Sequence, residues 1–166
     1  RYCASGLETI SIAAAEINAG MGEVYLAGGA ESMSMIPMTG YKLAPNYRFA
    51  NKTPEYLVGM GITAEAVSRK YNVDRESQDE FAYNSHKKAA AAIDAGVFKE
   101  EIVPIEVQEV RVESDQRKEN TWIVDMDEGV RRDTTPEGLA RLRPVFAQGG
   151  SVTAGNSSQM SDGAAF

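Results

Sequence analysis

The stretch LETISIAAAEINAGMGEVYLAGG at residues 7–29 decides the fold class of this chain. Its apolar residues recur at helical spacing over residues 7–19, with alanine on most sides, which predicts a helix buried almost all round. Gly20 and Gly22 end that helix, and the apolar run VYLA at 24–27 is typical of a strand covered on both faces. A buried helix followed by a buried strand indicates an α/β protein.

The middle of the chain begins with an irregular stretch. Residues 33–61 lack a sustained period and predict a long folded excursion, in which methionines at 33, 35 and 38 are expected to pack as core or to line an apolar pocket. A helix over 63–71 that ends at Asn72 follows, and Asp74 can cap a second one that Gly96 ends. The interior face of the second helix is expected to be Phe81, Ala82, Ala89 and Ile93.

The last third predicts a surface hairpin and a short helix. Alternation over residues 103–107 indicates a strand whose phase slips at Glu109 and Val110, which favours a bulge or break there. A charged turn over 113–120 leads to a returning strand at 121–124. Thr135 can cap a helix that stops before Pro144, and the small residues after Gly149 end in an apolar run that resembles the opening of a buried strand.

Composition and charge exclude several classes of protein. The 166 residues are 43% hydrophobic and 25% charged, which is typical of a globular domain with a core. The formal charge of −7 disfavours nucleic-acid binding. No apolar run reaches the roughly 18 residues of a membrane-spanning helix, and no leader sequence is visible. We therefore predict a soluble protein of the cytoplasm or an organelle matrix, since a single cysteine forms no internal disulfide.

Cys3 is the first candidate for chemistry, because it stands where the helix over 7–19 begins. Amide groups and the positive end of the helix dipole stabilise a thiolate there, so the residue can act as a nucleophile. The residues alone leave an inert, buried cysteine equally open.

The other residue patterns give no further site. The only histidine, His86, lies inside the second predicted helix beside two lysines and is expected to be a surface or boundary residue. One Cys and one His do not supply a usual metal-ligand set, so we predict no metal. The glycine pairs fit neither a dinucleotide-binding nor a phosphate-loop pattern.

A series of ordered motifs covers nearly the whole chain and resembles the thiolase family, most closely the 3-ketoacyl-CoA thiolases (acetyl-CoA acyltransferases) of fatty-acid β-oxidation. These motifs are RYCASGL at 1–7, AGGAESMS at 27–34, MGITAE at 60–65, DEFA at 79–82, EIVP at 101–104, DEGVR at 127–131, LRP at 142–144, TAGNSSQ at 153–159 and SDGAA at 161–165.

The resemblance implies a five-layer αβαβα fold of two similar halves, of which this chain would hold part of the first. Residues 1–32 and 150–166 would belong to the N-terminal core, and residues 33–149 to a loop domain that covers the site. Cys3 would attack a 3-ketoacyl-CoA and carry the acyl group as a thioester. Met60 would line the acyl pocket, and Arg143 would approach the nucleotide part of coenzyme A. Coenzyme A is a substrate, and no permanently bound cofactor is implied.

The chain also departs from the family pattern. The activating histidine of a Gly-His-Pro segment and a second cysteine of a Cys-x-Gly segment have no match here, so we expect these residues alone not to turn over substrate. Gly59, where acetoacetyl-CoA thiolases often carry His, favours the degradative type. A condensing acetoacetyl-CoA thiolase, a non-catalytic module binding CoA or lipid, and a fragment without independent function remain alternatives. The family implies a homodimer or homotetramer.

Overall fold

The computed structural model describes residues 1–166, which divide into two compact units. Residues 1–57 and 159–166 form the first unit, and residues 58–158 form the second. The expected division into an N-terminal core (residues 1–32 and 150–166) and a loop domain (residues 33–149) stays a prediction.

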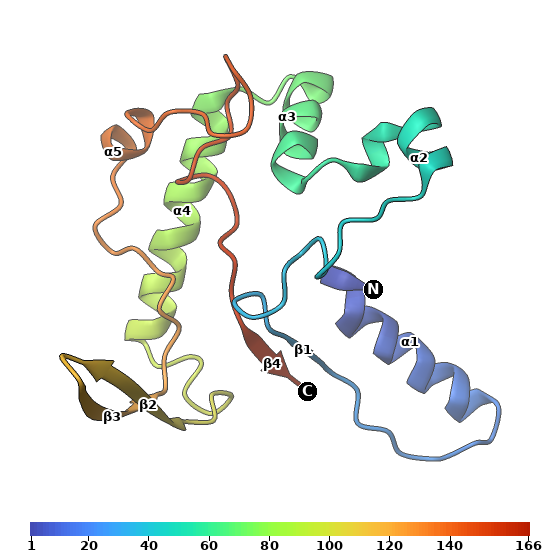
Figure 1. Ribbon diagram of the computed structural model, residues 1–166, viewed down its shortest axis with the longest axis vertical. Coiled ribbons are helices and arrows are strands. Elements are labelled where there is room, and N and C mark those ends of the chain that lie inside the picture. The colour runs from blue at the N-terminus through green and yellow to red at the C-terminus, as the bar shows by residue number, and fades with distance from the viewer. The chain divides into compact units, whose positions relative to one another are not determined.

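The first unit combines helices with a small antiparallel sheet (Figure 1). In the sheet, Gly29 pairs with Ala165, Ala30 with Ala164 and Glu31 with Gly163. The strand predicted at the end of the chain is thus present at residues 163–165, but all three of its residues are exposed, so its expected burial is wrong within this chain. The elements are the 3-10 helix Tyr2–Ala4, α1 (Ser5–Asn18), β1 (Gly29–Glu31), α2 (Tyr47–Lys52), the 3-10 helix Pro54–Leu57 and β4 (Gly163–Ala165).

Two predictions for the first unit are corrected. Helix α1 forms as predicted, but none of its residues is buried, because only β1 and the preceding turn contact it in this chain. The strand lies at 29–31 rather than 24–27, and Val24 is 91% exposed. An apolar run becomes a strand only where a neighbouring strand offers hydrogen bonds, and here β4 offers them at residues 163–165 alone.

The expected burial of the methionines is also wrong within this chain. Met35 and Met38 are exposed, and Met33 is half-buried in a turn. The excursion is not wholly irregular, because Asn46 caps α2 by accepting a hydrogen bond from the Arg48 N–H at 2.9 Å.

The second unit is built around two helices, and the predicted caps are confirmed. Asn72 ends the first helix in the left-handed conformation, and Asp74 caps the next by accepting from the Ser77 N–H at 2.8 Å. Thr135 caps the short last helix through the Gly138 N–H at 3.0 Å. The elements are α3 (Met60–Tyr71), α4 (Arg75–Asp94), β2 (Ile105–Glu113), β3 (Gln116–Val124) and α5 (Pro136–Ala140).

The hairpin of β2 and β3 is regular, so the predicted bulge is wrong. Pairing continues without interruption from Ile105 opposite Val124 to Glu113 opposite Gln116. Glu109 is half-buried in phase with Val107, which means that a charged residue occupies the inner side without a change of register. The turn is only Ser114-Asp115, both at positive φ, as a two-residue hairpin turn of type I′ requires.

The buried centre of the second unit is unusually polar. Its buried apolar side chains are Leu139 and Val152, and the other buried residues are Glu65, Asp79 and Thr153. Phe81, predicted on the interior face of α4, is instead 78% exposed. The inner side of α4 carries Asp79 and Ala82. Asp79 can lie there because the Asn156 side chain donates a hydrogen bond to it.

Candidate functional site

Cys3 lies exposed in the turn that opens α1. Its neighbour Tyr2 has a φ of 52°, a backbone conformation that residues other than glycine rarely adopt. The turn is held by a hydrogen bond from the Ala4 N–H to the Arg1 carbonyl at 3.1 Å. The Tyr2 carbonyl accepts from the Ser5 hydroxyl at 2.8 Å and from the Ser5 N–H. The predicted position of Cys3 at a helix start is therefore confirmed, and its sulfur is open to a reagent or substrate.

Strand β1 packs closely against the helix that follows Cys3. The Thr9 hydroxyl lies 2.9 Å from the carbonyl oxygens of both Gly6 and Gly28, so it bridges the first turn of α1 to the strand. Gly28 has no room for a side chain, because a Cβ would lie 2.3 Å from the Phe166 ring and 2.5 Å from the Ala165 carbonyl oxygen. Gly28 thus allows the chain end to pack closely beside β1, whereas Gly29 would accept a side chain at ordinary contact distances.

A carboxylate joins the ends of β1 and β4. Asp162 accepts from the Ser34 N–H at 2.8 Å and from the Ser34 hydroxyl at 2.5 Å. These bonds hold the pKa of Asp162 below its usual value. The chain therefore leaves β1 in a fixed turn beside the sheet.

The other two residues expected at the site, Met60 and Arg143, belong to the second unit. Met60 is the first residue of α3 and is exposed. Arg143 is exposed in the segment after α5. A Cβ on Gly61 would lie 2.3 Å from the Phe146 ring, so the segment after Arg143 packs on the start of α3.

Beneath that segment lies a buried carboxylate, Glu65, which is 2% exposed. Its Oε1 accepts from the Val152 N–H at 2.8 Å and the Ser151 N–H at 3.0 Å, and its Oε2 accepts from the Ser151 N–H at 3.1 Å. Burial raises the pKa of Glu65, but these N–H groups and the charge of Arg69 more than offset it and lower the pKa overall. Glu65 is thus an ionised anchor for residues 151–152.

A second polar cluster holds the same segment against α4. Asn156 donates from Nδ2 to Asp79 Oδ1 at 2.9 Å and to the Ser151 carbonyl at 3.1 Å. Asp79 Oδ2 is paired with Arg75 at 2.7 Å. The Thr153 N–H donates to Asn156 Oδ1 at 2.7 Å, so every polar atom of the Asn156 side chain is used.

The sequence does not predict these anchors. Glu65, Asp79 and Asn156 all stand inside quoted motifs, but their burial was not foreseen. The available signal was a lone acid four residues after Gly61, since residues at that spacing share one face of a helix.

His86 behaves as expected. It is half-buried on α4, and its Nδ1 accepts from the Arg131 N–H at 3.2 Å. It belongs to the second unit, while Cys3 belongs to the first.

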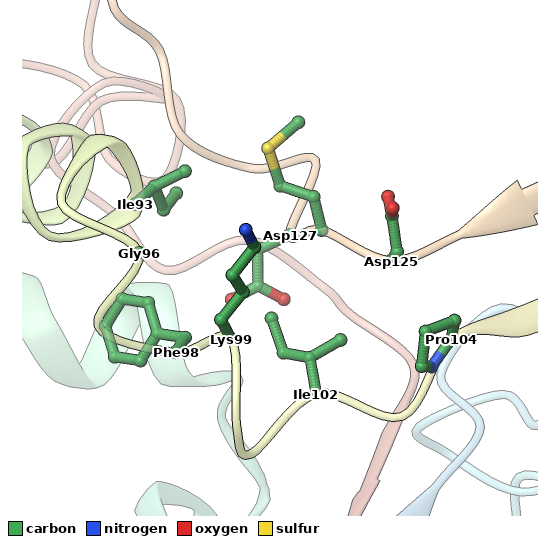
Figure 2. A pocket seen from close by; sticks show the side chains of 9 residues that line it. Ile93, Gly96, Phe98, Lys99, Ile102, Pro104, Asp125 and Asp127 are labelled. Atoms are coloured by element: carbon green, nitrogen blue, oxygen red, sulfur yellow. The ribbon is translucent and has the colours of Figure 1, made fainter.

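A separate hollow of about 330 Å³ lies at the other end of α4. Its walls come from the end of α4, the segment leading to β2 and the segment after β3, as Figure 2 shows. They combine apolar side chains such as Phe98 and Ile102 with the charged Lys99 and Asp127. No His, Cys, Asp and Glu cluster is arranged to hold a metal ion, and no helix is long and apolar enough to cross a membrane.

Comparison with known proteins places this geometry in one family. The N-terminal domain of thiolases matches residues 1–166. The 3-ketoacyl-CoA thiolase of Bacillus subtilis is 52% identical over 166 residues, covering 99% of this chain and 42% of its own length. The peroxisomal 3-ketoacyl-CoA thiolase 1 of Arabidopsis thaliana is 44% identical, covering 99% of this chain and 37% of its own.

A solved structure gives the same result. The dimeric peroxisomal thiolase of Saccharomyces cerevisiae superposes with a TM-score of 0.81 at 36% identity, over 98% of this chain and 40% of that one. The chain thus spans about two fifths of the length of the relatives it matches, and over that length it has the expected α/β thiolase fold. By its sequence motifs, its fold and these likenesses, the chain belongs to the thiolase family.

Proposed function

We propose that the protein containing this chain is an acetyl-CoA C-acyltransferase that cleaves 3-ketoacyl-CoA by thiolysis, as in fatty-acid β-oxidation. The observation that carries the proposal is the exposed Cys3 in the turn before α1, within a chain half identical to a 3-ketoacyl-CoA thiolase.

The chemistry assigned to Cys3 is covalent catalysis. Its thiolate attacks the 3-keto carbonyl carbon, and the bond between carbons 2 and 3 then breaks. The electron pair of that bond takes up a proton, so acetyl-CoA leaves and the shortened acyl group stays on Cys3 as a thioester. The thiol of a second coenzyme A attacks this thioester, loses its proton, and returns Cys3 to the thiolate. One difficult exchange is thereby divided into two easier ones.

The first residues of α1 support this assignment, because N–H groups at the start of a helix lack acceptors within it and stabilise developing negative charge. The groups that move protons in the family, a histidine and a second cysteine, have no match among these residues. We infer that segments outside residues 1–166 supply them.

Binding of the substrates is assigned to the second unit. Met60 is proposed to line the acyl pocket, and its flexible thioether suits chains of different length. Arg143 is proposed to contact the nucleotide part of coenzyme A, where a guanidinium pairs well with phosphate. Coenzyme A enters as a substrate, and no permanently bound cofactor is proposed.

The test is thiolysis by the full-length protein. We expect CoA-dependent cleavage of a 3-ketoacyl-CoA that is lost in Cys3→Ser and kept in Ser11→Ala, which changes an exposed serine of α1 outside the turn that carries Cys3. Absence of cleavage in the wild-type protein, or full activity in Cys3→Ser, would contradict the proposal.

Two alternatives are separated by related measurements. A condensing acetoacetyl-CoA thiolase has the same Cys3 chemistry with a narrower pocket, so it would act on four-carbon substrates alone. A non-catalytic module would bind CoA or lipid without transferring an acyl group to Cys3.

Assembly and location are proposed from the relatives. The yeast thiolase is described as dimeric, and the exposed apolar side chains of α1 favour assembly into a homodimer or homotetramer. Relatives come from bacteria and from peroxisomes, which favours the cytoplasm or an organelle matrix.

A further inference from the structure

One face of α3 is occupied by the segment over residues 143–152. Gly61 lies beneath the Phe146 ring, and one turn later Glu65 binds the N–H groups of Ser151 and Val152. Because positions four apart share a helix face, both contacts fix the same segment. Met60 directly precedes the first of these contacts.

The same segment carries Arg143 and is held on both sides of it. Before Arg143, the Arg75 guanidinium donates to the Leu142 carbonyl at 3.1 Å. After it, the Val145 N–H donates to the Val152 carbonyl at 3.1 Å. Val152 is itself held by Glu65 at 2.8 Å, so the position of Arg143 depends on Glu65 through two hydrogen bonds.

Both carboxylate oxygens of Glu65 accept hydrogen bonds from this segment. The carboxylate is buried and faces two backbone N–H groups of residues 151–152. A carboxylate in these surroundings accepts charge-assisted hydrogen bonds and is poorly suited to take up a proton. Glu65 therefore acts by holding the backbone of residues 151–152 in place.

We propose that Glu65 is a positioning residue for coenzyme A, which holds residues 145–152 on α3 and so fixes Arg143 relative to Met60. The proposal rests on the function proposed above, since that function assigns Met60 and Arg143 to substrate. It adds a residue that touches neither substrate nor Cys3.

The test measures the dissociation constant of coenzyme A by calorimetry on the full-length protein. Glu65→Ala is expected to weaken binding by about tenfold or more, because Arg143 loses its fixed position. Glu65→Gln keeps an oxygen that can accept from Val152 and should weaken binding less. The matched control is Glu80→Ala, an exposed acid on α4 whose loss should leave binding unchanged.

Two further readouts separate positioning from general stability. The rate at which iodoacetamide alkylates Cys3 should stay within about twofold of wild type, because the thiol lies in the other unit and bound substrate is not involved. Amide exchange at Ser151 and Val152 should accelerate in Glu65→Ala. A misfolded variant would change the number of binding sites, whereas positioning changes the dissociation constant.

The outcomes distinguish the two proposals. Wild-type protein that binds coenzyme A without thiolysis would contradict the proposed function, and the variants would still decide the role of Glu65. Dissociation constants within about twofold of wild type in both Glu65 variants would overturn the positioning role. Wild-type protein that does not bind coenzyme A would overturn both.

Discussion

Replacing Asn156 by aspartate would place a second carboxylate against Asp79. In the structure Nδ2 of Asn156 lies 2.9 Å from Asp79 Oδ1 and 3.1 Å from the Ser151 carbonyl oxygen. The substitution preserves size and shape and keeps the oxygen that accepts from the Thr153 N–H. It removes two donated hydrogen bonds and adds a like charge.

The expected loss of stability follows from these distances. Two unit charges about 3 Å apart repel by about 5 kcal/mol at an effective dielectric constant of about 20. Arg75, 2.7 Å from the other oxygen of Asp79, compensates part of this. The new carboxyl can also take up a proton, which at pH 7 costs about 4 kcal/mol from an ordinary pKa of about 3.9. We therefore expect Asn156→Asp to lower the free energy of unfolding by about 2–4 kcal/mol at pH 7.

The loss should depend on pH with a defined sign. Repulsion raises the pKa of the introduced carboxyl in the folded state above its unfolded value. The repulsive part of the loss is therefore present in full above the folded pKa and disappears as the pH falls to the unfolded value, whereas the part due to lost hydrogen bonds remains. Urea unfolding of Asn156→Asp and wild type, followed by circular dichroism at pH 7 and at about pH 4.5, measures both arms.

A double variant provides the control. Adding Asp79→Asn to Asn156→Asp reverses the pair, restores a donor between the two side chains and removes the repulsion, so we expect it to recover part of the stability. A difference below about 0.5 kcal/mol between Asn156→Asp and wild type at pH 7 would refute the reasoning, as would a loss of equal size at both pH values.

Three further predictions concern single contacts. Thr9→Val, which removes the hydroxyl bridging α1 and β1, should slow acyl transfer to Cys3 while Thr9→Ser restores it, as measured by single-turnover kinetics; equal rates in both would contradict it. Thr135→Ala should destabilise the unit by about 1 kcal/mol through loss of the α5 cap, and an unchanged urea midpoint would speak against this. Because Ser34 lowers the pKa of Asp162, the stability that this carboxylate contributes is present above its unfolded pKa and is lost as pH falls through the folded pKa. Asp162→Asn should remove that acid-dependent part of the melting temperature, and an identical pH profile would count against the bond.

Local structure could be predicted well from the sequence. The caps at Asp74 and Thr135 and the left-handed end at Asn72 follow from side-chain and backbone preferences within a few residues. The position of Cys3 at the start of α1 followed in the same way.

Burial could not be predicted, because it depends on which partners surround an element. The apolar periodicity of α1 predicted a buried helix, yet within this chain only β1 and the preceding turn contact it. The apolar run at 24–27 lacked a pairing strand, and Phe81 faces outward while polar Asp79 lies inside. Glu109 interrupts the alternation of apolar and polar residues and so suggested a change of register. The regular pairing of β2 with β3 shows that the register does not change there.

The polar anchors of the candidate site were hidden for a related reason. Glu65 and Asn156 belong to motifs that the sequence analysis quoted, but their partners are 86 residues and 77 residues away along the chain. Local spacing does not reveal such pairs, and only the folded chain brings them together.

The central claim is that Cys3 carries the acyl group, and the most direct test is mass spectrometry of the peptide containing it. The full-length protein should be mixed with a 3-ketoacyl-CoA in the absence of free coenzyme A, quenched in acid and digested. We predict a mass increase equal to the shortened acyl group on the peptide with Cys3, which disappears when coenzyme A is added before the quench. An unmodified Cys3 peptide in a protein that still cleaves the substrate would contradict the account.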